Sequence, residues 1–307
     1  MSARWLRPAV RLGAALVLPF VVPGLITGLI WALPGDPASI ICPPELCSGT
    51  EALAERWNLD KGPWHFFSSW VSGALTGDFG NSWRLQQGIP VAELLEESIP
   101  TTAALVSLGL LLLILGATGA ATRWLPAKLD PVLQAVGLVP AVVMAMSAAA
   151  ALTIGYGVEQ YSDQANLLRL GLGALALGLA DAALSGTVTG VRGLMESERR
   201  QRYVQMAILR GEGTLSNALP NTLPALAGQM RARTLHLLSG AVVVEVVLQI
   251  NGLGDLLWGG TLAQDFGVVL AASFGFAVLS AALLLLQALV EIGTELHVRR
   301  SPGGVVA

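Results

Sequence analysis

The chain has 307 residues, of which 53% are hydrophobic and only 13% are charged, and its formal net charge is -3. Soluble globular proteins carry about a quarter charged residues. A mean hydropathy of +0.64 therefore excludes an ordinary soluble domain and indicates an integral membrane protein. The 35 glycines and 16 prolines are typical of closely packed, locally broken membrane helices.

Six apolar runs are long enough to cross a bilayer as helices, which takes roughly 20 residues. The first run follows a basic N-terminus like that of a signal peptide. It is too long for one and lacks a small-residue cleavage site, so we expect a retained helix over 1–33. The sequence thus predicts an all-α membrane protein. Its expected spans are 9–33, 100–122, 131–154, 167–188, 223–249 and 267–292.

The segment 34–99 separates the first two spans and has helical apolar spacing, turn signals and several aromatic residues. One interpretation is a small helical cap packed on the bundle. The other is a docking surface for an external binding protein, and the two are compatible. Aromatic side chains favour the lipid headgroup level, so an interfacial belt is expected from Trp57, Trp64, Phe66, Phe67 and Trp70.

The only two cysteines, Cys42 and Cys47, lie in this same segment. An oxidising compartment would favour a disulfide that closes the small loop between them. Two free thiols are the alternative interpretation. A metal site would need further ligands, and His65 is the only histidine of the segment, so no metal is expected.

The basic residues are distributed unevenly between the two sides of the predicted membrane. If the N-terminus is cytoplasmic, 34–99 faces outward with only Arg56, Lys61 and Arg84 against nine carboxylates. Cytoplasmic loops carry the excess of Lys and Arg, which predicts that both termini lie on the cytoplasmic side of the bacterial inner membrane. Twelve of the 18 basic residues then lie inside: Arg4, Arg7, Arg11, Arg123, Lys128, Arg192, Arg199, Arg200, Arg202, Arg210, Arg299 and Arg300.

A short polar helix is expected between the fourth and fifth spans, on the basic side. Ala207 and Gly211 lie four residues apart in this polar segment, and the carboxylate of Glu245 follows inside the fifth span. Membrane helices rarely keep such a carboxylate without structural or functional cause. A docking helix next to a polar span suggests a transport pore that is driven by a separate motor.

Further charged residues lie inside predicted spans: Asp181 in the fourth, and Arg231 and Arg233 in the fifth. Arg at a bilayer centre costs roughly 2.5–3.5 kcal/mol, so such groups should face the bundle interior or water. Residues two apart point to different faces of a helix, so at most one of the two arginines lines a central path. For Arg231 the alternative is snorkelling toward the inner surface. His236 is expected to be a packing or pore residue.

Motifs of enzymatic chemistry are missing from the sequence. Neither lysine, Lys61 or Lys128, follows the glycines of a G-x-x-x-x-G-K-[ST] phosphate loop, which excludes ATP hydrolysis by that route. No G-x-S-x-G or H-E-x-x-H motif occurs, so no catalytic residue is assigned. Two alternatives are a stand-alone channel or secondary transporter, which would predict inverted repeats that are not visible here, and a non-transport membrane assembly protein.

Six sequence motifs together resemble the permease subunits of ABC importers for dipeptides, oligopeptides and nickel. Their order and spacing follow the family nearly end to end, and the last two are the most specific. The motifs are LPGDP at Leu33–Pro37, WNLDKGPWHFF at Trp57–Phe67, GDFGNSW at Gly77–Trp83, IPTT at Ile99–Thr102, YVQMAILRG at Tyr203–Gly211 and GAVVVEVVLQINGLGDLL at Gly240–Leu257.

The resemblance implies that Tyr203, Val204, Ala207 and Gly211 belong to the EAA loop, whose short coupling helix sits in a cleft of the cytoplasmic ATPase. Small residues on one helical face permit close approach, and a glycine ends the helix. An ordinary amphipathic connector is the alternative. For Glu245 the resemblance favours a structural hydrogen-bonding role at the outer mouth.

The resemblance also implies a type I importer architecture and a set of partners. The expected parts are an N-terminal transmembrane helix at 1–33, an extracytoplasmic segment at 34–99, a core permease domain at 100–298 with its coupling loop near 196–222, and a cytoplasmic tail at 299–307. The expected partners are a second homologous permease, two cytoplasmic ATPases that carry ATP and Mg, and an extracytoplasmic solute-binding protein. Membrane lipid completes the surroundings, and neither a nucleic-acid partner nor a cofactor on this chain is expected.

This sequence departs from the family pattern at three places. The stretch between Gly211 and the fifth span is shorter than usual, and Arg202 replaces the acidic residue that often precedes the Tyr-Val pair. The DPR-like ending of the family is absent, and HVRRSP at 297–302 stands in its place.

Overall fold

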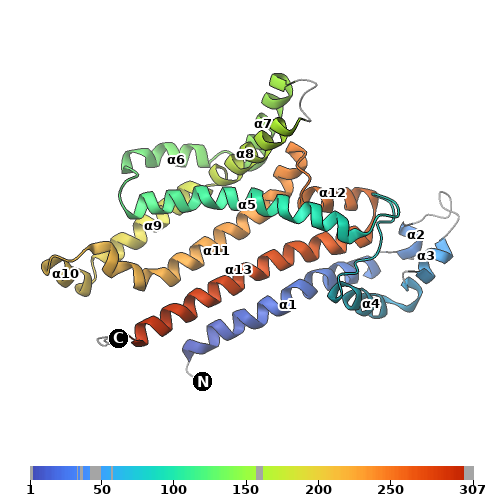
Figure 1. Cartoon of the computed structure of the whole chain (residues 1–307), viewed down its shortest axis with the longest axis horizontal. Helices are drawn as coiled ribbons and strands as arrows, with labels where there is room; N and C mark the ends of the chain where they lie inside the picture. The colour runs from blue at the N-terminus through green and yellow to red at the C-terminus, as the bar shows by residue number, and fades with distance from the viewer. Residues whose placement is uncertain are drawn as a thin grey trace. The chain divides into compact units, whose positions relative to one another are not determined.

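The computed structural model describes residues 3–32, 34, 37–41, 50–56, 58–156 and 162–300. Within these ranges the regular structure is helical, with one isolated antiparallel bridge between Asn81 and Pro90 (Figure 1). The all-α prediction is confirmed. Cys42 and Cys47 lie outside the described residues, so their disulfide stays a prediction.

Three helices are long and apolar enough to cross a membrane alone: α1 (Ala3–Ala32), α5 (Val91–Ala121) and α13 (Phe266–Arg300). Three bent helix pairs also qualify, which makes six spans if each pair is one span. The pairs are α6 (Asp130–Gly137) with α7 (Ala141–Tyr156), α8 (Asp163–Leu179) with α9 (Ala183–Arg199), and α11 (Thr214–Leu248) with α12 (Leu253–Ala263), bent by 82°, 46° and 70°.

The described residues form two compact units that each draw on distant parts of the sequence. The first unit consists of Met1–Ala14, Ala103–Ile250 and Ala282–Ala307, and contains α6 to α11. The second consists of Ala15–Thr102 and Asn251–Ala281.

In the second unit, the segment after α1 folds into short helices over an aromatic core. These are α2 (Pro37–Ile41), α3 (Thr50–Arg56), a 3-10 turn at Leu59–Lys61, and α4 (Pro63–Leu75). Trp64 is exposed, whereas Phe66 and Trp70 are buried and contact the rings of Trp31 and Phe274, respectively. An interfacial belt is therefore the wrong expectation for Phe66 and Trp70, because α4 turns both toward the core of its own unit.

A single carboxylate organises the turn that follows α4. Asp265, just before α13, is fully buried. Its Oδ2 accepts hydrogen bonds from Ser82 Oγ at 2.8 Å and from the backbone N–H groups of Trp83, Arg84 and Leu85 at 2.7, 3.0 and 3.3 Å. Its Oδ1 accepts from Val268 N at 3.3 Å, the position that an N-cap side chain satisfies.

In the first unit, the breaks of two bent pairs lie against each other. Asp181 and Ala182 adopt left-handed backbone with φ of 49° and 56°. Their N–H groups donate to the carbonyls of Val139 and Gly137 at 3.2 and 2.8 Å, and Asp181 Oδ2 accepts from Ala141 N at 3.3 Å. Helix breaks in a membrane persist only where such groups are satisfied within the protein. Asp181 thus holds the α6–α7 and α8–α9 breaks together.

Candidate functional site: the coupling helix and the polar groups of the spans

The polar stretch predicted to dock on a partner forms a separate short helix, α10 (Arg202–Leu209), which packs against α9 and α11. Figure 1 shows α10 at the shared end of these two helices. Gly211 follows it with φ of 81°, and its N–H donates to Ile208 O at 2.9 Å while Glu212 N donates to Ala207 O at 3.0 Å. This pair of bonds is a Schellman motif. The predicted glycine stop with positive φ is confirmed.

The two faces of α10 differ sharply in exposure. Val204 and Ala207 are 0% and 1% exposed, so they pack inside this chain. The expectation that Ala207 faces the ATPase is wrong, because its face of α10 seats the helix on its own unit. The most exposed apolar side chains of α10, which the sequence reasoning missed, are Met206 at 58% and Leu209 at 81%, and Ile208 is exposed at 47%. The three-residue spacing of Met206 and Leu209 puts both side chains on one face of a helix, and this was the sequence pattern that could have identified them.

Tyr203 connects α10 to the helices on either side of it. Its hydroxyl donates to Glu198 Oε1 near the end of α9. Burial is the largest cause that raises the pKa of Tyr203. A hydrogen bond with Asn221 of α11 opposes the rise, and Glu198 adds to it. The phenol is protonated at neutral pH even at its ordinary pKa of 10.0, and the raised pKa extends its capacity to donate to higher pH. Tyr203 therefore fixes the seat of α10 as well as contributing to its partly exposed surface.

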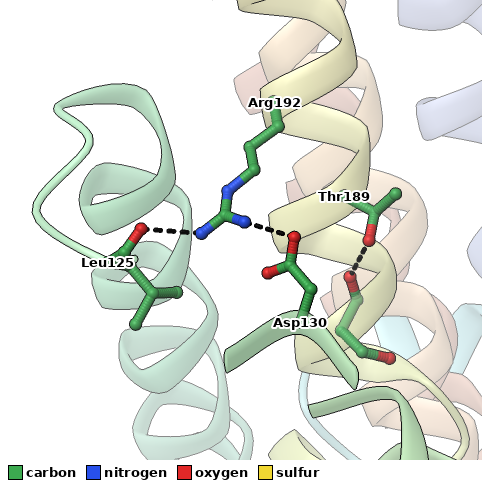
Figure 2. A network of polar contacts seen from close by, with 5 residues as sticks. Leu125, Asp130, Thr189 and Arg192 are labelled. Atoms are coloured by element: carbon green, nitrogen blue, oxygen red, sulfur yellow. Dashed lines mark hydrogen bonds and ion pairs between the residues drawn. The ribbon is translucent and has the colours of Figure 1, made fainter. Parts of the chain in front are cut away.

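A second network fixes α9 just before the coupling helix (Figure 2). The Arg192 guanidinium reaches from α9 to Asp130 Oδ2 at the start of α6, and donates to Leu125 O at 2.7 Å. Both charged side chains are mostly buried. A bond between ionised partners is stronger than a neutral one, so the turn between α5 and α6 is tied firmly to the helix that leads into α10.

The polar residues predicted inside the spans occupy different environments. Glu245 is 0% exposed, near the end of α11, and its backbone carbonyl accepts from Ile250 N at 2.9 Å. Arg231 and Arg233 are half-buried on α11, and Arg231 Nε is a buried donor that no acceptor of the described residues reaches. Arg169 of α8, which sequence reasoning did not single out, is 6% exposed beside a cavity of about 280 Å³. In the described ranges, no group of three or more His, Cys, Asp or Glu is placed to hold a metal ion.

Comparison with known proteins places this arrangement in a family. Residues 106–296 match the family model of the binding-protein-dependent transport system inner membrane component. The dipeptide transport system permease protein DppB of Lactococcus lactis subsp. cremoris is 26% identical over 302 residues, which cover 94% of this chain and 97% of that protein.

A second kind of relative is similar over slightly less of the chain. The glutathione transport system permease protein GsiC of Escherichia coli is 27% identical over 272 residues, or 84% of this chain and 87% of that protein, and its counterpart from Shigella boydii is equally similar. The similarity spans both units, and the family model covers the helices from α6 to α12 completely. The chain therefore belongs to the binding-protein-dependent inner membrane permeases, as a multi-pass permease subunit of an ABC importer and not an enzyme.

Proposed function

We propose that this permease forms half of the translocation path for peptides or closely related small solutes. A second homologous permease supplies the other half, two cytoplasmic ATPases bind ATP and Mg, and an extracytoplasmic binding protein delivers the solute. The relatives named for dipeptide and glutathione transport support this substrate class, since both are similar over most of the chain.

The outward apolar face of α10 carries the proposal of ATPase coupling. Exposed Met206 and Leu209 lie on a helix outside the apolar spans, where water would otherwise surround them. Exposed apolar groups of this kind mark protein contacts. In the proposed mechanism, closure of the ATPase dimer moves α10, and α9 and α11 follow because Tyr203 and the Val204–Ala207 face bind α10 to them. The bundle halves then alternate between inward-open and outward-open states by rigid-body motion.

The proposed orientation places both termini and α10 in the cytoplasm. In a background without Cys42 and Cys47, a cysteine at the exposed Trp64 of α4 should react with an impermeant maleimide added to intact cells. A cysteine at the exposed Ser197 of α9 should react only after the cells are opened, because the arginines nearby keep that end inside. Labelling of Ser197→Cys in intact cells would overturn this orientation.

The assignment itself is tested by co-expression of this chain with the ATPase and second-permease subunits of the same organism. We expect a stable complex on affinity purification of the tagged chain, and uptake of L-alanyl-L-alanine in a strain deleted for its other peptide importers. Purification of a solitary oligomer would contradict the partner set. A stable complex that takes up no peptide would contradict the substrate class alone.

A further inference from the structure

Two cations in the middle of α11 have no counter-charge in the part of the chain that the structure describes. Neither Arg231 nor Arg233 has a hydrogen bond or ion pair among the described residues, and the Arg231 Nε donor is buried without an acceptor. Cations at membrane depth face a bundle interior or a water-filled cavity and find an anionic partner there. No described residue supplies that partner for Arg231 or Arg233.

The position of the Arg233 head argues against snorkelling for this residue. A Cβ added to Gly186 of α9 would lie 2.2 Å from Arg233 Nη2, and one added to Gly190 would lie 2.2 Å from Gln229 Nε2. Gln229 and Arg233 are thus one turn apart on α11 and meet glycines one turn apart on α9. Both side chains therefore extend laterally from α11 toward α9, and not along the helix axis toward a membrane surface. The two glycines leave the room that this arrangement requires.

The outward face of α11 beside Arg233 differs from the faces that α1 and α5 expose. Between residues 225 and 239 its exposed residues are Ala225, Ala232, His236 and Ser239. Their spacing of seven, four and three puts them on one helical face. By contrast, α1 exposes Leu16, Val17, Val21, Leu25 and Leu29, and α5 exposes Leu108, Leu111, Ile114 and Leu115. Those large apolar faces suit lipid, whereas the small and polar face of α11 suits an aqueous path.

Arg231 and Arg233 stand on the two sides of this face, one residue before and one after Ala232. His236 lies three residues beyond Arg233, about 4.5 Å further along the axis, where helical neighbours meet. This part of α11 therefore offers a guanidinium and an imidazole on one side of the same face, with no carboxylate of α11 between residues 214 and 244.

We propose that Arg233, with His236 one turn further along α11, binds a carboxylate group of the solute during its passage. The proposal rests on the proposed peptide function and adds the position that holds the solute. A carboxylate is the fitting ligand because a guanidinium offers two parallel N–H donors that match its two oxygens. Every free peptide has such a group at its C-terminus.

The test compares a free dipeptide with its amide in the complete importer. Uptake of labelled L-alanyl-L-alanine and of L-alanyl-L-alaninamide is measured for the natural chain, Arg233→Gln and Arg233→Lys. The same natural binding protein serves every variant, so its own preference cancels when the ratio of acid to amide uptake is compared between variants. Arg233→Gln should lower that ratio by about tenfold or more, the lower end for a hydrogen bond to a charged group. Arg233→Lys should recover much of it, because the charge remains.

The matched control is Arg123→Gln, which removes the same charge from an exposed turn after α5 and should leave the ratio unchanged. A second readout serves if the binding protein rejects the amide. In a background without Cys42 and Cys47, the dipeptide should slow maleimide labelling of Ser239→Cys, and Arg233→Gln should abolish this protection.

Three results would overturn the proposal. An unchanged ratio with intact protection would exclude a carboxylate at Arg233. Equal loss of acid and amide uptake, together with loss of the second permease on purification, would assign the guanidinium to a carboxylate of that subunit. If the natural importer takes up neither probe and neither protects Ser239→Cys, the peptide assignment fails before any Arg233 variant is examined, and this site fails with it.

Discussion

Replacing Met206 and Leu209 together with glutamate is expected to abolish solute uptake while the protein stays in the membrane. Their side chains are 58% and 81% exposed on the outward face of α10, so neither change disturbs the packing of this chain. Apolar hot-spot residues at an interface contribute about 2 kcal/mol or more each, which is roughly thirtyfold in affinity per residue. Two buried carboxylates without partners would add a desolvation cost.

The measurement is co-purification of the ATPase with the tagged permease, together with uptake and membrane level. The conservative pair Met206→Leu and Leu209→Met keeps the apolar surface and should retain both the complex and transport. Ala207→Glu separates docking from folding, because that side chain is buried within the chain and its replacement should lower the membrane level itself. Normal ATPase binding and uptake by the double glutamate variant would show that α10 only connects α9 to α11 and does not bind the ATPase.

Replacing Asp265 with alanine should have the largest effect on stability. The carboxylate is fully buried and accepts from one hydroxyl and four backbone N–H groups. A buried donor left without a partner costs about 1–3 kcal/mol, so the two buried donors, Ser82 Oγ and Val268 N, together cost on the order of 2–6 kcal/mol, and the three part-buried amides add to this. Domain stabilities are only about 5–15 kcal/mol. We therefore expect a strong fall in membrane level and in the melting temperature of purified protein.

Asp78 provides the matched control for that substitution. It lies in the same unit but is exposed, and its carboxylate accepts a single hydrogen bond from Gly80 N at 2.9 Å. Asp78→Ala should therefore cost about 1 kcal/mol or less. The loss of stability for Asp265→Asn should lie between those of Asp265→Ala and Asp78→Ala. An amide keeps one acceptor oxygen, but its NH2 group would face the N–H donors around it. Equal melting temperatures for Asp265→Ala and Asp78→Ala would show that the turn at 82–85 holds without its carboxylate.

The membrane class, the helical spans and the short helix before the fifth span were accessible from the sequence. These properties depend on residues near one another along the chain. The run of apolar residues sets a span, and Gly211 sets a helix stop because only a residue that tolerates positive φ ends a helix in this way. The motifs at Tyr203–Gly211 and Gly240–Leu257 likewise indicated the permease family, since each is a contiguous stretch.

Tertiary structure alone decided which side chains of those elements are exposed for contact with other molecules and which are buried within the chain. Ala207 and Leu209 are two residues apart on one helix, yet one is 1% and the other 81% exposed, because α9 and α11 cover only one face of α10. The role of Asp181 depends on a second helix break 40 residues earlier in the chain. The lateral course of Arg233 depends on the room beside Gly186. Burial and counter-charge are set by segments distant in sequence, so local patterns predicted the helices but not the faces on which they act.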